Sequence, residues 1–151
     1  MLKPHKRAEV QFNEIREIGQ EGRNSKAHVV HDVQLDTEIV MKRIPKSRMS
    51  SRDEYFEEAR TLHATAHQNV VPILYACEDA DFVYLALPYL KNGSLKSLIT
   101  TRLPTVREIV RIGCQLLSGI HNIHSKNLIH FDIKPDNVLL SDRGEALLSD
   151  F

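Results

Sequence analysis

The sequence predicts an α+β protein, with an antiparallel sheet and one helix in its first half and mainly helices in its second half. Apolar and polar residues alternate in three segments before Pro45, as in strands that bury one face. Between Thr105 and Ser125 apolar residues instead recur every three or four positions, as in an amphipathic helix. After Leu128 only short apolar pieces remain.

Three strands are expected first in the chain. They cover residues 10–18, 27–33 and 38–44, with a polar turn over 34–37 between the second and the third. Pro45 is expected to end the third strand, because proline lacks the N–H group that a sheet would use.

A helix is expected next, over residues 50–66. Ser51 is a candidate N-cap, and Glu54 stands three residues later, as in a capping box. The apolar residues that repeat at helical spacing, and so predict a buried stripe, are Tyr55, Ala59 and Leu62. Two further strands are expected after this helix, over residues 73–77 and 82–87.

The second half is expected to begin with a short helix over 95–100, capped by Ser94. Thr105 and Glu108 form a second possible capping box, which opens a long helix to about Ser125. The apolar stripe of that helix consists of Ile109, Ile112, Leu116, Ile120 and Ile123. The apolar pieces 138–140 and 146–148 flank a Ser-Asp-Arg-Gly turn and predict a small hairpin.

Composition excludes several classes of protein. The 151 residues include 20 Lys and Arg against 20 Asp and Glu, so the chain has none of the positive charge expected of a general nucleic-acid or anionic-membrane binder. With 42% hydrophobic residues it can bury a core. The longest apolar run, residues 70–77, is far too short for a membrane helix. Cys77 and Cys114 form no CxxC pair, which favours free thiols in a cytoplasmic protein.

The strongest chemical signal is a group of polar residues after the long helix. Asp132 can accept a proton from a hydroxyl group, and Lys134 places a cation where negative charge builds up. Asn137 and Asp150 offer oxygen ligands of the kind that suit Mg²⁺. An acid, a cation and metal ligands at this spacing predict a site for phosphoryl transfer.

The segment His130-Phe131-Asp132-Ile133-Lys134-Pro135-Asp136-Asn137, followed by Asp150-Phe151, resembles the catalytic and metal-binding loops of the eukaryotic-like protein kinases. The resemblance implies that Asp132 receives the proton of the substrate hydroxyl and that Lys134 steadies the γ-phosphate of ATP. It also implies that Asn137 and Asp150 hold Mg²⁺. The Lys-Pro pair resembles the serine/threonine-directed members, so the implied partner is a protein with a Ser or Thr acceptor. Phe131 replaces an Arg that in relatives grips an activation-loop phosphate, which puts that form of control in doubt.

The first half carries matching segments. Ile39-Val40-Met41-Lys42 resembles the strand whose Lys holds the α- and β-phosphates of ATP, and Glu58 is the expected partner of that Lys, with Glu57 as the competing candidate. The segment from Tyr84 to Leu95 resembles the hinge that holds adenine. In this resemblance Leu87 is the gatekeeper, and Pro88 and Leu90 offer backbone hydrogen bonds. Leu140 is implied as the apolar floor beneath adenine.

The phosphate-binding loop is the weakest match. Residues 18–27 contain Gly19 and Gly22 but one residue too many, and Ala27 replaces the usual Val. Fewer glycines allow less close approach of the backbone to phosphate, so we expect a lower nucleotide affinity than in typical relatives. The nucleotide-binding residues that the resemblance implies are Ile18, Gly19, Gly22, Ala27, Val40, Lys42, Glu58, Leu87, Pro88, Leu90 and Leu140.

The resemblance implies three segments: an N-terminal extension over 1–11, an ATP-binding lobe over 12–90 and part of a helical lobe over 91–151. The chain ends one residue short of the expected D-F-G glycine, so we expect a piece of a longer domain with impaired activity on its own. The stripe of the long helix would then lack partners, which predicts self-association. Two alternatives stay open: a pseudokinase or ATP-binding interaction module, and a small-molecule kinase of the aminoglycoside or choline type.

Overall fold

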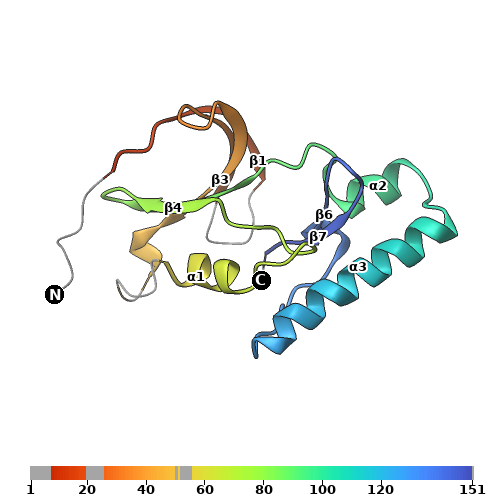
Figure 1. Ribbon diagram of the computed structural model, residues 1–151. Coiled ribbons are helices and arrows are strands. Elements are labelled where there is room, and N and C mark those ends of the chain that lie inside the picture. The colour runs from red at the N-terminus through yellow and green to blue at the C-terminus, as the bar shows by residue number, and fades with distance from the viewer. Residues whose placement is uncertain (1–7, 20–25, 50, 52–55, 151) are drawn as a thin grey trace.

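A computed structural model describes residues 8–19, 26–49, 51 and 56–150. Its first half is a five-stranded antiparallel sheet in the order β1-β2-β3-β5-β4, accompanied by one helix (Figure 1). Its second half holds two helices and a two-stranded hairpin. The predicted α+β architecture, with a sheet and one helix followed by helices and a hairpin, is thereby confirmed. The elements of the first half are β1 (Phe12–Gly19), β2 (Lys26–Asp32), β3 (Thr37–Pro45), the 3-10 turn η1 (Lys46–Arg48), α1 (Glu57–Ala64), β4 (Tyr75–Glu78) and β5 (Phe82–Pro88).

The five strands lie close to their predicted positions, with small differences at their ends. Pro45 is the last residue of β3 rather than the residue after it, and it lies opposite Phe82. Proline is tolerated at that point because the ladder ends there. The largest shifts are of two residues: β1 begins at Phe12 instead of residue 10, and β4 begins at Tyr75 instead of residue 73.

Helix α1 covers only the later part of its predicted range. The described helix begins at Glu57, and Phe56 before it makes no side-chain capping bond. Glu54 and Tyr55, which belonged to the predicted capping box and stripe, lie outside the described residues. Ala59 and Leu62 are buried as predicted, and they pack with Val83 and Leu85 of β5.

The second half follows its capping signals. It contains α2 (Leu95–Thr101), α3 (Val106–Ser125), the 3-10 turn η3 (Pro135–Asn137), β6 (Val138–Leu140) and β7 (Ala146–Leu148). The Ser94 hydroxyl accepts a hydrogen bond from the N–H of Ser97 and caps α2. Thr105 and Glu108 form the predicted capping box at the start of α3.

The prediction that the apolar stripe of α3 lacks packing partners is wrong. The β6–β7 hairpin covers most of it: Ile112 and Ile123 are buried with Leu148, and Leu116 and Ile120 pack against the same cluster. Only Ile109 of the stripe stays exposed. The apolar surface that does face solvent lies on another side of α3 and just before it. It consists of Leu103, Val106, Val110 and Leu117.

Backbone contacts join the two halves at the hairpin. The N–H of Leu148 donates to the carbonyl of Asn69 at 2.9 Å, and the N–H of Val71 donates to the carbonyl of Leu148 at 2.9 Å. Gly119 of α3 makes this approach possible, because a Cβ atom there would lie 2.8 Å from the Asn69 carbonyl oxygen. The hairpin therefore leads Asp150 back toward the sheet and α1. In the part of the chain that the structure describes, no helix has the length and apolarity to cross a bilayer.

Candidate active site

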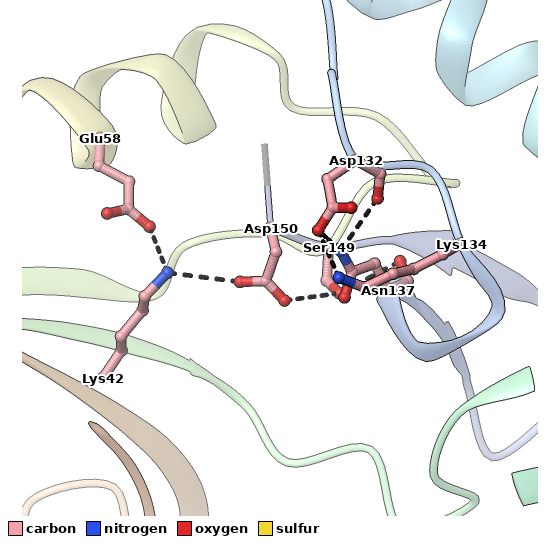
Figure 2. Close-up of polar contacts among 7 residues, drawn as sticks. All are labelled: Lys42, Glu58, Asp132, Lys134, Asn137, Ser149 and Asp150. Atoms are coloured by element: carbon pink, nitrogen blue, oxygen red, sulfur yellow. Dashed lines mark hydrogen bonds and ion pairs between the residues drawn. The ribbon is translucent and has the colours of Figure 1, made fainter. Parts of the chain in front are cut away.

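Three charged side chains from distant parts of the chain meet between the sheet and the hairpin (Figure 2). Lys42 lies on the central strand β3, where strand pairing with Ala27 and Leu85 fixes its backbone. Its Nζ atom donates to Oε1 of Glu58 on α1 at 2.8 Å and to Oδ1 of Asp150 at 3.3 Å. The Lys42 side chain is only 12% exposed, so its charge is held by these two carboxylates in a partly desolvated place.

The loop over residues 130–137 forms a second cluster beside the first. The Nζ atom of Lys134 donates to Oδ2 of Asp132 at 2.6 Å, and the side-chain amide of Asn137 donates to the same oxygen at 2.8 Å. The ammonium of Lys134 lowers the pKa of the Asp132 carboxyl below its ordinary value, and the pKa of Lys134 is raised in turn by Asp132. Asp132 is therefore held as a carboxylate.

The residues that precede Asp132 shape the loop. His130 is buried, and burial lowers its pKa below the usual range, which favours the neutral ring. Its Nδ1 atom accepts a hydrogen bond from the N–H of Asp132 at 3.4 Å. Phe131 has a left-handed backbone with φ of 62° and a side chain that is 88% exposed. The Phe131 side chain thus faces solvent.

A cavity of about 450 Å³ is lined by Glu58 and Asp150 of the first cluster and by Asp136 of the loop that carries the second. Its volume is within the usual range of small-molecule sites. The predicted nucleotide-binding residues that line it are Ile18, Val40, Glu58, Leu87, Pro88 and Leu90. Leu140 does not line it, and the prediction for that position is wrong. Leu140 is 6% exposed and packs in the core with Ile112, whereas the cavity is lined by Leu139. Neighbouring residues of a strand point to opposite faces, so Leu139 faces the cavity and Leu140 faces the core.

A family model for the protein kinase domain matches residues 12–151. This chain belongs to the protein kinase family. Its five-stranded sheet with one helix, followed by helices and a hairpin, is the arrangement expected for that family.

Several curated protein kinases are similar to this chain. The serine/threonine-protein kinase PknD of Chlamydia trachomatis is 29% identical over 91% of this chain and 16% of its own length. The serine/threonine-protein kinase STE20 of Candida glabrata is 26% identical over 93% of this chain and 15% of its own length. The serine/threonine-protein kinase SMU1 of Mycosarcoma maydis is 26% identical over 93% of this chain and 19% of its own length. The chain thus spans less than a fifth of each of these relatives.

The glycine-rich part of this kinase chain is only partly described. Gly19 ends β1 and lies opposite Ala27, which is 1% exposed on β2. Gly22 lies outside the described residues.

One contact at the cavity was missed by the sequence reasoning. Arg16 of β1 donates a hydrogen bond to the hydroxyl of Tyr89, the residue between Pro88 and Leu90 in the sequence. Arg16 and Tyr89 both line the cavity. No motif marks this pair, because it joins the edge strand to the hinge segment across 73 residues.

The side-chain oxygen atoms of Asn137 and Asp150 are suitable ligands for a magnesium ion. The Asn137 amide nitrogen is engaged with the Asp132 carbonyl at 3.0 Å and with the Asp132 carboxylate at 2.8 Å. This orientation assigns the Asn137 side-chain oxygen as the atom available to a cation. A carboxylate from Asp150 and an amide oxygen from Asn137 are both hard ligands, which Mg²⁺ prefers.

Proposed function

We propose that this chain carries the nucleotide-binding and catalytic part of an ATP- and Mg²⁺-dependent protein serine/threonine kinase. The observation that carries the proposal is a pair of polar clusters linked through Ser149, which contacts Asn137 and Asp150 and lines the cavity. Lys42, Glu58 and Asp150 converge on one side, and an exposed Asp132 carboxylate lies between Lys134 and Asn137 on the other. This set combines a phosphate-binding cation, metal ligands and a base, as phosphoryl transfer requires.

In the proposed reaction each residue has a separate task. Asp132 accepts the proton that the acceptor hydroxyl loses while its oxygen bonds to the γ-phosphorus and the bond to the β-phosphate oxygen breaks. Lys134 balances the negative charge near the transferred group, and Lys42, held by Glu58, binds the α- and β-phosphates. Asn137 and Asp150 would hold Mg²⁺, which when bound neutralises phosphate charge.

The apolar part of the cavity suits the adenine ring. Val40, Leu87 and Leu139 line it, and the backbone of Pro88 and Leu90 would offer hydrogen bonds. The Leu90 carbonyl already accepts from the N–H of Gly93 at 3.1 Å, and a carbonyl oxygen has a second lone pair for another donor. Pro88 retains its carbonyl although it lacks an N–H.

Three broader expectations belong to the same proposal. We propose a cytoplasmic location, in agreement with the free thiols of Cys77 and Cys114. We keep the division into lobes over 12–90 and 91–151. We also propose that the isolated chain has impaired activity and self-associates through the apolar surface that contains Val110 and Leu117. Sedimentation velocity checks this last point, and a monomer at all concentrations would contradict it.

The choice of acceptor tests the proposal against its alternatives. The chain is incubated with Mg-ATP and, in separate reactions, with Ser, Thr and Tyr peptides, an aminoglycoside and choline. We expect phosphate on Ser and Thr peptides, at a low rate because the activity of the isolated chain is proposed to be impaired. Transfer only to the small alcohols would favour a small-molecule kinase. Mg-ATP binding without any transfer, in a protein that contains the rest of the domain, would favour a pseudokinase.

A further inference from the structure

We propose that Ser149 is a positioning residue for the metal site: its hydroxyl bridges Asn137 and Asp150 and sets the arrangement in which they bind a divalent cation. The inference rests on the proposed function, because it concerns the cation that would accompany ATP. Neither the catalytic motif nor the comparisons assign a role to Ser149. It is the residue between the end of β7 and Asp150.

Ser149 contacts the backbone carbonyl of Asn137 and the carboxylate of Asp150, and its backbone also contacts His130. Its N–H donates to the Asn137 carbonyl at 2.9 Å. Its hydroxyl lies 3.2 Å from the same carbonyl and 3.1 Å from Oδ2 of Asp150. Figure 2 shows the contact between Ser149 and the carboxylate of Asp150. A hydroxyl has a single proton, so it is shared between, or alternates between, these two acceptors.

The backbone of Asp150 has an uncommon conformation. Its φ of 58° lies in the left-handed region, which residues other than glycine rarely adopt. The two carboxylate oxygens are held from opposite sides, Oδ1 by Lys42 at 3.3 Å and Oδ2 by the Ser149 hydroxyl at 3.1 Å. Each oxygen keeps a further lone pair for a cation. Loss of the hydroxyl would free one side of the carboxylate.

The burial of Ser149 makes the arrangement rigid. The residue is 7% exposed, and it also lines the cavity next to Asp150. A buried hydroxyl is expected to keep its hydrogen bonds, because water cannot replace them readily. Hydrogen-bonding partners of metal ligands commonly tune affinity without touching the metal.

The test measures Mn²⁺ binding to the chain in the presence of a non-hydrolysable ATP analogue, with the electron paramagnetic resonance signal of free Mn²⁺ as the readout. Ser149→Ala is expected to weaken Mn²⁺ binding roughly tenfold, the lower end of the range for such partners. Ser149→Thr keeps the hydroxyl and is expected to bind Mn²⁺ with nearly the affinity of the parent. Thermal unfolding without metal or nucleotide checks that each variant is folded.

Ser141→Ala is the matched control. The Ser141 hydroxyl also donates to a carboxylate, that of Glu145, at 3.1 Å, and it stands in the turn of the same hairpin, outside the cavity. We expect this variant to bind Mn²⁺ as the parent does. Equal Mn²⁺ affinity in the parent and in a folded Ser149→Ala would overturn the inference and leave the proposed function intact. A folded parent that binds no Mn²⁺ with the analogue would overturn both.

Discussion

The cluster around Lys42 and the catalytic loop around Asp132 differ in how they are built. Lys42 contacts Glu58 and Asp150 across separations of 16 and 108 residues, so that cluster exists only when the sheet, α1 and the hairpin are packed together. Asp132 contacts Lys134 and Asn137 within five residues, so the loop assembles its own cluster. The first cluster therefore depends on tertiary packing and the second on local backbone geometry.

The two clusters also differ in exposure. The side chains of Lys42 and Asp150 are 12% and 23% exposed, whereas those of Lys134 and Asp132 are 49% and 55% exposed. A covered cluster suits a nucleotide that stays within the cavity, and an open carboxylate suits an acceptor that arrives from solvent. Variants in the two clusters should therefore affect different steps.

The largest expected effect is on transfer itself. Asp132→Asn keeps the shape of the side chain but removes the base, so we expect phosphotransfer to fall about 10²- to 10⁴-fold. Nucleotide binding should be unchanged, since the proposed role of Asp132 is toward the acceptor hydroxyl and not toward the nucleotide. The measurement is the rate of peptide phosphorylation in a protein that contains the rest of the domain. Asp142→Asn, at an exposed position in the β6–β7 turn, is the control. Full activity of Asp132→Asn would remove Asp132 from the role of base.

A smaller effect is expected in the covered cluster. Lys42→Met removes the charge that Glu58 and Asp150 hold, and we expect nucleotide affinity to fall roughly tenfold to a hundredfold, as for the loss of a charged hydrogen bond. Calorimetric titration with Mg-ATP measures it. Lys96→Met on the exposed side of α2 provides the comparison and should bind as the parent does. Equal affinity for Mg-ATP in both variants would show that Lys42 does not bind the phosphates.

The packing that brings the clusters together can be broken from α3. Gly119→Ala places a Cβ atom 2.8 Å from the Asn69 carbonyl oxygen and 3.1 Å from Leu148. We expect the free energy of unfolding to fall by about 1–3 kcal/mol. Gly113→Ala in the same helix meets nothing within 4 Å, so it should be neutral or stabilise by up to about 1 kcal/mol. Urea denaturation of both variants checks the contrast, and equal unfolding free energies would refute the close approach.

The smallest effect concerns pH. Lys134 lowers the pKa of Asp132, so Asp132 stays a base down to a pH below the ordinary range of an aspartate. Lys134→Gln removes that ammonium and should let the pKa rise toward its ordinary value. We therefore expect the acidic limb of the pH profile of kcat/KM to move to higher pH, whether or not the maximum value of kcat/KM changes. Thermal unfolding at each pH controls for acid denaturation, and an unmoved limb would show that Lys134 does not set this pKa.

The sequence predicted local features better than long-range ones. The capping residues Ser94 and Thr105 marked the starts of α2 and α3 correctly, because capping involves neighbouring residues only. The pair of Lys42 with Glu58 rather than Glu57 was inferred from family resemblance and helix spacing, and the structure places Glu58 against Lys42.

The failures have physical reasons. The resemblance implied Leu140 as the adenine floor, whereas Leu139 lines the cavity. The pattern of the sequence could not correct this, because two adjacent leucines do not show which face of a three-residue strand is buried. The stripe of α3 was expected to be exposed because nothing in the sequence tells that the hairpin packs on it. Arg16 was missed because its contact with Tyr89 joins segments that are 73 residues apart. Ser149 was missed because its contact with Asn137 depends on the pairing of the hairpin strands.

The central claim is that the covered cluster binds nucleotide while the open loop carries out transfer. Thermal unfolding of the parent, Lys42→Met and Asp132→Asn in rising concentrations of Mg-ATP tests it most directly, because a ligand stabilises the state that binds it. We predict equal rises in unfolding temperature for the parent and Asp132→Asn, and a clearly smaller rise for Lys42→Met. A folded parent that shows no rise at millimolar Mg-ATP would contradict the account.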